Sequence, residues 1–398
     1  MKWEKVKLGN VTDSCLGKML DQNKNKGDYQ PYLANVNVRW GEFDLEDLPL
    51  MKFQESEQER YELKYGDLVI CEGGEPGRCA IWKEQIPNMK IQKALHRVRV
   101  HDCLDYRYLF YWFLLAGKTG ELDQYFTGAT IKHMPGQKLK EVVIDKPPLE
   151  IQHRIADILS AYDDLIGNNQ KQIKLLEEAA QRLYKEWFVD LNFPGHENTK
   201  IVDGVPEGWS VYPFSSKVDI MSGGTPKTSI PDYYNGKIPF YTPKDSDGAF
   251  FAYKTQINIT EDGLKNCNSR LYPPKTVIIT ARGTVGKTTI LAVPMAMNQS
   301  CYALKMKEND APYYLFFALN NEIKALQTMA NGGVFNTIIG KTFDSINIQI
   351  PKDPLIYGFE KTVRPFMEQI KNKLQANSKL VEARDRLLPK LMSGEVKV

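Results

Sequence analysis

The sequence has few of the residues that build disulfide frameworks or metal centres, and it has no long apolar segment. Its six cysteines form no C-x-x-C pair and have no zinc-like spacing with the five histidines. The N-terminus lacks the apolar core of a signal peptide. The most apolar run, residues 108–115, is too short to cross a bilayer. We therefore expect a cytoplasmic protein with free thiols, no metal and no membrane contact.

Known catalytic motifs are also missing. No G-x-G-x-x-G turn follows a strand, no N-P-P-aromatic segment of an amino-methyltransferase is present, and Asp245 and Asp247 have no third acidic neighbour for a nuclease centre. Residues 281–288 nearly fit a phosphate-binding loop, but Ala281 replaces its first glycine. Strand-forming residues up to Pro294 replace the helix that should follow. The sequence thus indicates a binding protein without catalytic activity, with a P-loop NTPase carrying a coiled-coil arm as a remote alternative.

What the sequence does contain is an internal repeat over most of its length. Residues 67–78 parallel residues 276–287, and each segment reads as a buried strand, a glycine-rich turn and a second strand. The other matched pairs are Trp3 with Trp209, Gln30 with Ile238, Tyr108 with Tyr314, residues 128–134 with 332–338, and residues 142–147 with 346–351. The length of this collinear series indicates two copies of one domain.

A long helix is predicted after each copy. Apolar residues recur at three-four spacing in both helices, as in the seam of a coiled coil. The predicted seam residues are Ile155, Ile158, Tyr162, Leu165, Ile173, Leu176, Leu183, Val363, Phe366, Ile370, Leu374, Leu380 and Leu387. Asn169 and Asn377 either lie in the seam and fix its register or lie just beside it. Pro365 is expected to start or kink the second helix, and Pro389 to end or kink it.

The expected fold is therefore a pair of mixed α/β (α+β) domains separated by two long antiparallel coiled-coil helices, in a pseudo-two-fold arrangement. The alternative is that each helix packs only on its own domain. The predicted segments are residues 1–147 and 208–352 for the two domains, 148–192 and 353–398 for the two helical spacers, and 193–207 for a linker.

Two similar lobes suit a target with two spaced sites, which double-stranded DNA provides. The formal net charge of +3 permits such a polyanion but does not require it. Lysines and threonines in the predicted loops suit phosphates, and arginines and asparagines can read base edges. The candidate DNA-binding residues are Lys24, Lys26, Asn35, Asn37, Arg39, Lys132, His133, Thr225, Lys227, Thr228, Lys237, Lys244, Arg282, Lys287 and Asn336, with Lys18 and Arg78 beside them. Each could equally be an ordinary surface residue.

Several of these segments resemble one known family. Residues 147–155, 158–166 and 176–188 resemble the central conserved region of type I restriction enzyme specificity subunits, and residues 382–395 resemble the second conserved region. Residues 222–227, 238–245 and 281–287 look like the opening motifs of a target recognition domain. The resemblance covers essentially the whole chain in the same order.

The resemblance implies two target recognition domains that each read half of a split, asymmetric DNA sequence, with the helices as spacer. It also implies two modification (methyltransferase) subunits and restriction (motor-nuclease) subunits as partners. S-adenosylmethionine and ATP would then bind those partners, and no cofactor would bind this chain. The first copy departs from the pattern at residues 72–78, where its turn is acidic, so that a DNA contact by this turn is doubtful. A stand-alone DNA-binding adaptor without a nuclease partner is an open alternative.

Overall fold

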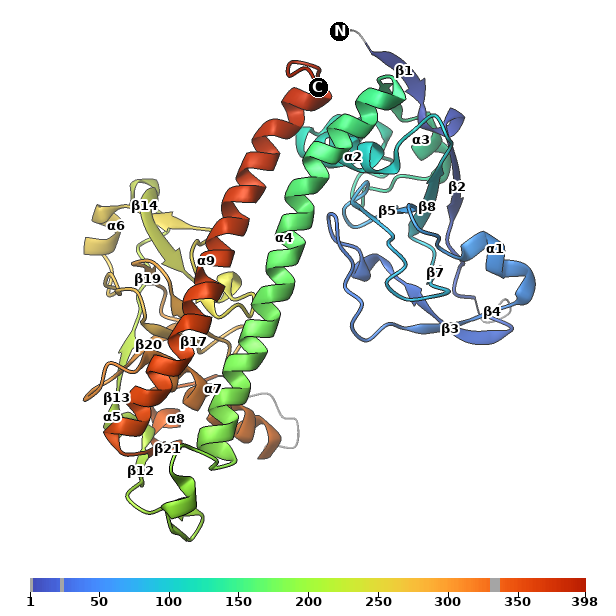
Figure 1. Ribbon diagram of the computed structural model, residues 1–398. Coiled ribbons are helices and arrows are strands. Elements are labelled where there is room, and N and C mark those ends of the chain that lie inside the picture. The colour runs from blue at the N-terminus through green and yellow to red at the C-terminus, as the bar shows by residue number, and fades with distance from the viewer. Residues whose placement is uncertain (1–2, 22–24, 330–336) are drawn as a thin grey trace. The chain divides into compact units, whose positions relative to one another are not determined.

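The computed structural model describes residues 3–21, 25–329 and 337–398 (Figure 1). The chain forms two compact units. The first comprises Met1–Ile166 and Lys379–Val398, and the second comprises Gly167–Ser378. Each unit therefore contains one globular domain together with parts of both long helices.

The first unit is built around an antiparallel four-stranded sheet and a smaller three-stranded sheet. The larger sheet has the order β2 (Thr12–Leu16), β8 (Leu95–Val100), β5 (Leu68–Cys71) and β6 (Cys79–Ile81). The smaller sheet has the order β4 (Leu50–Phe53), β3 (Asp28–Leu33) and β7 (Lys90–Ile91), and β1 (Glu4–Lys7) pairs separately with β9 (Val143–Lys146). The helices of this domain are α1 (Gln58–Tyr61), α2 (Tyr106–Thr119) and α3 (Gly136–Glu141), with 3-10 turns η1 (Leu8–Asn10), η2 (Asn35–Asn37), η3 (Glu55–Glu57) and η4 (Glu121–Tyr125).

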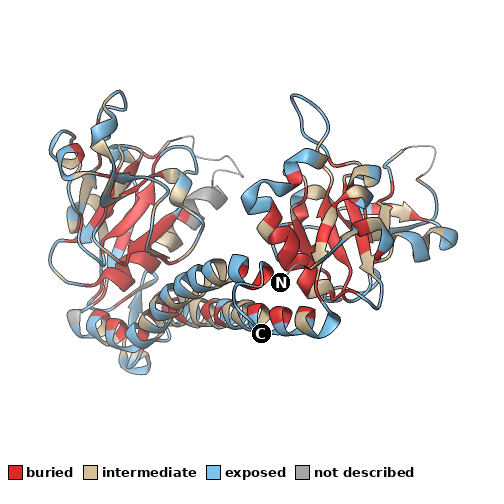
Figure 2. Cartoon of the chain, turned by 90° about the horizontal axis from the view of Figure 1, so that it is seen from above, coloured by how far each residue is buried: buried red, intermediate tan, exposed pale blue. Residues whose placement is uncertain are grey.

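Local signals explain the main elements of this unit. All four residues of β5 are buried, as expected for a central strand of apolar residues. Helix α2 begins where the Asp105 carboxylate accepts hydrogen bonds from the N–H groups of Arg107 and Tyr108, and it ends at Gly120, whose φ is 75°. The apolar side chains of α2 pack on the larger sheet. Figure 2 shows buried residues gathered in the interior of each globular domain.

The second unit repeats this design. Its larger sheet has the order β13 (Val218–Ser222), β20 (Cys301–Met306), β17 (Val277–Thr280), β18 (Thr288–Leu291) and β15 (Phe251–Ala252). Its smaller sheet has the order β16 (Asn258–Ile259), β14 (Tyr234–Tyr241) and β19 (Ala296–Met297), and β12 (Ser210–Pro213) pairs with β21 (Asn347–Ile350). The other elements of this domain are α5 (Phe214–Lys217), α6 (Glu261–Lys265), α7 (Pro312–Met329) and α8 (Gly340–Asp344), the 3-10 turns η7 (Pro231–Tyr233) and η8 (Pro243–Asp245), and before them η6 (His196–Asn198) and the hairpin β10–β11 (Ile201–Val202, Val205–Pro206).

The two domains have matching topology, which confirms the repeat predicted from the sequence. Strand β5 pairs with β6 and β8 as β17 pairs with β18 and β20. In both copies the longest strand of the small sheet has one antiparallel and one parallel neighbour. The mixed α/β fold class and the duplication are thus confirmed.

The two long helices are α4 (Leu149–Tyr184), extended by a π-helical turn η5 (Lys185–Val189), and α9 (Asp353–Met392). In the first unit Asp163 of α4 forms an ion pair with Arg384 of α9. In the second unit Asn169 meets Asn377, and the ring of Tyr184 meets that of Phe359. Within the second unit residue numbers rise along α4, from Asn169 to Tyr184, as they fall along α9, from Asn377 to Phe359, so that the helices pair antiparallel as predicted.

The packing of α4 differs from the prediction near its start. Ile158 and Leu165 are 36% and 47% exposed, whereas Leu159 is fully buried. Inside the helix pair the spacing is a regular four-three pattern through Ile155, Leu159, Tyr162, Ile166, Asn169 and Ile173. At two points the predicted stripe was one residue too early, because it placed Ile158 and Leu165 in the seam where the structure has Leu159 and Ile166. Both residues of each neighbouring pair are apolar, so that the sequence pattern does not distinguish them.

Helix α9 also continues through Pro365, at which it was expected to start or kink, and through Pro389, at which it was expected to end or kink. It neither begins at Pro365 nor ends at Pro389. Both prolines lie on the exposed side of the helix, and so does Lys361, whose carbonyl loses its hydrogen-bond donor to Pro365. Water can replace that donor on an exposed face, which makes the proline tolerable.

Candidate nucleic-acid interface

In the first unit, loops from three parts of the chain meet at the glycine-rich turn between β5 and β6. From the loop around η2, the Asn35 side-chain amide donates to the Gly73 carbonyl at 2.7 Å. From the loop before α3, the N–H of Met134 donates to the Glu72 carbonyl at 2.7 Å. The turn therefore holds together the segments that carry Asn35, Arg39, Lys132 and His133.

The second unit assembles the same three segments. The Thr284 hydroxyl donates to the Pro243 carbonyl at 3.2 Å, which joins the turn between β17 and β18 to η8. The N–H of Ile338 donates to the Ala281 carbonyl at 2.9 Å, as Met134 does to Glu72 in the first unit. Lys244, Arg282 and Lys287 are thereby brought together.

The two turns have the same backbone geometry. Gly77 donates its N–H to the Cys71 carbonyl at 3.0 Å, and Gly286 donates to Thr280 at 2.8 Å. Both glycines have positive φ, 88° and 82° respectively, a conformation that residues with a Cβ rarely adopt. The conserved hydrogen bonds make each position in one turn equivalent to one in the other, so that Gly73 corresponds to Arg282, Glu75 to Thr284 and Arg78 to Lys287.

Most of the predicted DNA-binding side chains are accessible. The exposed ones are Lys26, Arg39, Lys132, His133, Thr225, Lys227, Thr228, Lys237, Lys244, Arg282 and Lys287, and Asn35 is half-buried. In each unit the glycine-rich turn and the two loops bonded to it form what we call a three-loop cluster. Outside these clusters lie Lys26, Lys237 and the segment from Thr225 to Thr228. Thr225 contacts Gln299, which lies next to the second cluster. Lys24 and Asn336 lie outside the described residues.

Asn37 and Lys18 have structural roles that the sequence analysis did not foresee. Asn37 is 6% exposed, and its side chain accepts from the Ala34 N–H at 2.9 Å and donates to the Asp44 carbonyl at 3.1 Å. Lys18 is 3% exposed and pairs with Glu57. A buried polar group needs such partners, and neither side chain is left to reach a ligand. We therefore leave both out of the proposed contacts.

Two residues that sequence reasoning missed lie beside the clusters. Lys93 is exposed and directly precedes Ala94, whose carbonyl accepts from the Glu72 N–H at 2.8 Å. Gln299 holds the equivalent position before Ser300, whose carbonyl accepts from the Ala281 N–H at 2.7 Å. An alignment of the two copies through this segment would have pointed to both.

The turn around residues 281–287 is not a phosphate-binding loop. It leads from β17 directly into the antiparallel strand β18, whereas a P-loop must lead into a helix whose N-terminus holds the phosphate. Near the equivalent turn of the first unit, burial raises the pKa of the Cys71 thiol to about 11, which keeps it protonated and unreactive. Burial also lowers the pKa of His96, whose ring nitrogen contacts the Met134 carbonyl at 3.0 Å.

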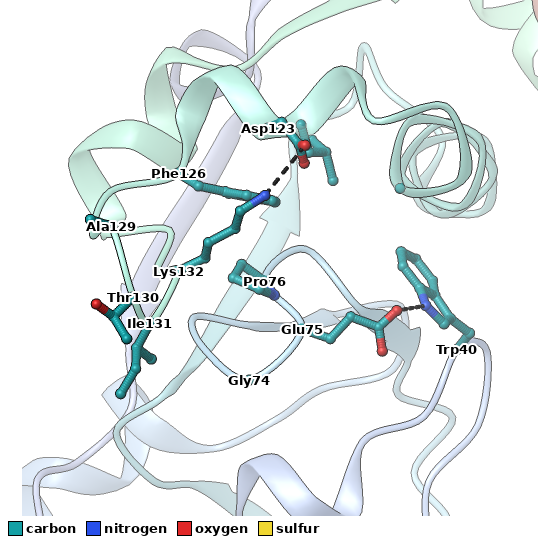
Figure 3. Close-up of a pocket in the computed structure, with 12 residues that line it drawn as sticks. Trp40, Gly74, Glu75, Pro76, Asp123, Phe126, Ala129, Thr130, Ile131 and Lys132 are labelled. Atoms are coloured by element: carbon teal, nitrogen blue, oxygen red, sulfur yellow. Dashed lines mark hydrogen bonds and ion pairs between the residues drawn. The ribbon is translucent and has the colours of Figure 1, made fainter. Parts of the chain in front are cut away.

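The cluster of the first unit borders a pocket of about 500 Å³ (Figure 3). Glu75 and Trp40 line one side, where the indole N–H donates to the Glu75 carboxylate at 2.7 Å. Asp123 and Lys132 line another side and form an ion pair at 3.4 Å. Within the described ranges, no group of three or more acidic, histidine or cysteine residues could hold a metal, and no helix is long and apolar enough to span a bilayer.

Comparison with known proteins agrees with this architecture. The sequence profile of the "Type I restriction modification DNA specificity domain" matches residues 1–178 and 206–377. The MjaIX specificity subunit of Methanocaldococcus jannaschii, a type I restriction enzyme component, is 30% identical over 84% of this chain and 78% of its own length. The HindI specificity subunit of Haemophilus influenzae is 22% identical over 99% of both chains.

A solved structure shares the fold. The crystal structure of the type I restriction–modification S subunit from M. genitalium aligns over 98% of this chain and 96% of its own, with a TM-score of 0.58 and 18% identity. The profile matches both copies of the repeat, and the archaeal relative matches most of the chain. The chain therefore belongs to the family of type I restriction–modification specificity subunits.

Proposed function

We propose that this chain is a non-catalytic subunit that directs a type I restriction–modification enzyme to a bipartite, asymmetric sequence in double-stranded DNA. Residues 1–147 and 208–352 are the two target recognition domains, 148–192 and 353–398 form the helical spacer, and 193–207 link the two halves. Each domain reads one half-site through its three-loop cluster. Lysines of the clusters contact phosphates, and arginine and asparagine read base edges.

One observation carries this proposal: the same three-loop scaffold occurs twice, with different side chains at equivalent positions. Arg282 stands where the first domain has Gly73, and Thr284 stands where it has Glu75. A shared scaffold suits one way of approaching DNA, and different side chains suit different base sequences. We therefore expect the two domains to read two different half-sites.

The partners in this proposal are two modification subunits and the restriction subunits, which bind S-adenosylmethionine and ATP. Helices α4 and α9 each pass from one unit into the other, so that they can supply docking surfaces and set the spacing of the half-sites. The chain itself needs no cofactor for this role.

Methylome sequencing tests the proposal. The modification subunits would be produced in a host without adenine methylation, with and without this chain. We expect methylation of one split motif with two different halves only when the chain is present. A single continuous motif, or the same methylation without the chain, would contradict the proposal.

A further inference from the structure

The turn of the first domain carries an exposed carboxylate that the second domain lacks. The Glu75 side chain is 55% exposed, and the equivalent residue of the second domain is Thr284. Around Glu75 the meeting loops carry the exposed cations Arg39 and Lys132. A carboxylate at such a surface repels phosphates, so that a DNA-binding role for Glu75 must involve a base.

The Glu75 carboxylate is held in place by two donors from different segments. The Trp40 indole N–H donates to one oxygen at 2.7 Å, and the Arg78 guanidinium donates to the other at 3.1 Å. Arg78 is fixed in turn by the carbonyl and side-chain oxygens of Asn35, at 3.2 and 3.1 Å. Trp40 packs over Gly117, where any Cβ would lie 2.7 Å from its ring.

This arrangement leaves acceptor capacity on the carboxylate. An ionised carboxylate has about four lone-pair positions, and Trp40 and Arg78 occupy one on each oxygen. Figure 3 shows Glu75 at the edge of the pocket, with the Asp123–Lys132 ion pair on another side. Among the described residues Lys132 pairs with Asp123 rather than with Glu75, so that the remaining lone-pair positions of Glu75 are open to an incoming donor.

Base chemistry selects that donor. In the major groove a carboxylate accepts well from the N4 amino group of cytosine. The adenine amino group lies beside the N7 acceptor, and guanine and thymine present acceptor oxygens, all of which repel a carboxylate. In contrast to the expectation from the acidic sequence of this turn, we infer that Glu75 is a specificity-determining residue that reads a cytosine in the half-site of the first domain. This inference rests on the proposed function.

The test replaces Glu75 in the chain assembled with its modification subunits and compares methylomes. Glu75→Gln is expected to weaken the preference for cytosine at one position about tenfold or more and to admit adenine, because glutamine pairs with adenine N6 and N7. Glu75→Thr, which introduces the residue type of Thr284, is expected to remove the preference at that position. Glu55→Gln, at an exposed site in η3, is the matched control and should leave the motif unchanged.

Arg282→Ala identifies the half-site of the second domain, and thermal unfolding midpoints show whether each variant is folded. The inference is supported if Glu75→Gln changes one C·G pair and only in the half-site that Arg282→Ala leaves intact. It is overturned if a folded Glu75→Gln variant keeps the complete motif or alters the half-site that responds to Arg282→Ala. A wild-type chain that yields no split motif would instead overturn the proposed function, and this inference with it.

Discussion

Glu360 is a buried residue of α9 whose carboxyl group accepts hydrogen bonds from the start of α7. It is 4% exposed, and one carboxyl oxygen accepts from the N–H groups of Tyr313 and Tyr314, each at 2.8 Å. These N–H groups belong to the first turn of α7, where backbone donors have no partner within the helix. Burial nevertheless dominates and raises the pKa of Glu360 to about 7.

This raised pKa predicts a loss of stability as the pH rises. Below the ordinary carboxyl pKa of 4.5 the folded and unfolded states are both protonated, and the contribution of Glu360 is complete. Between pH 4.5 and about 7 the unfolded state releases its proton first, and the contribution is lost by the time the pH exceeds 7. The loss amounts to at most about 3 kcal/mol.

Glu360→Gln should remove this pH dependence while keeping an acceptor for the two N–H groups. Urea unfolding of wild type and variant at pH 5 and pH 8 would measure the pH dependence of their free energies of unfolding. We expect the stability of the variant relative to wild type to be higher at pH 8 than at pH 5, and Glu207→Gln, at an exposed site in the same unit, to show no such difference. An unchanged difference between wild type and Glu360→Gln at the two pH values would contradict the assignment.

At single residues, the sequence predicted chemical type better than accessibility. Arg282 and Lys287 are exposed beside the turn, but Asn37 has the same residue type as Asn35 and is buried. Its amide satisfies the backbone of η2, just as the Asp245 carboxylate accepts from the Thr242 N–H at 2.8 Å in η8. Loop composition cannot show which of two asparagines closes a turn, because that depends on backbone geometry.

At the scale of elements, the Asn169–Asn377 pair is a polar contact within the seam of α4 and α9. The Asn169 amide donates to the Asn377 side-chain oxygen at 2.8 Å, and Asn169 is 8% exposed. Asn169 occupies a position that the four-three spacing of α4 assigns to the seam, and Asn377 meets it from α9. A polar pair at one level of an apolar seam disfavours shifted registers, since a shift would place each amide against an apolar side chain.

A double-mutant cycle measures this contact. Asn169→Ala and Asn377→Ala each remove the same hydrogen bond, so that the double variant should lose less stability than the sum of the single losses. We expect a coupling of about 1 kcal/mol in urea unfolding. Asn168→Ala, at the exposed neighbouring position, should combine additively with Asn377→Ala. Additive losses for the Asn169–Asn377 pair would show that the hydrogen bond does not stabilise the seam.

Some elements could be predicted from the sequence more accurately than others. The antiparallel helices and the repeat could be predicted because each rests on a pattern that recurs many times along the chain. The side of α4 that faces α9 was misjudged at Ile158 because Leu159 is also apolar, and only the facing helix decides between them. The contact of Asn35 with Gly73 was out of reach, since it joins two loops through a specific turn geometry.

At the scale of the whole molecule, both long helices cross from one compact unit into the other. Helix α4 does so between Ile166 and Gly167, and α9 does so between Ser378 and Lys379. The first unit is made of two separate stretches of chain, whereas the second is one continuous stretch, and each contains a segment of both long helices. In the proposed function, the length of helix between the units therefore determines the gap between half-sites.

Lengthening both helices at the points where they cross tests this relation. One heptad inserted between Ile166 and Gly167, and another between Ser378 and Lys379, keeps the seam in phase and leaves each unit intact. Each heptad adds about 10.5 Å of helix, or about three base pairs of B-DNA. Methylome sequencing should show a gap about three base pairs longer and unchanged half-sites. Seven residues inserted after Gly204, in the exposed β10–β11 turn, should leave the gap unchanged. If the heptads fold as helix, which circular dichroism would show, and the gap stays the same, the helices do not set the spacing.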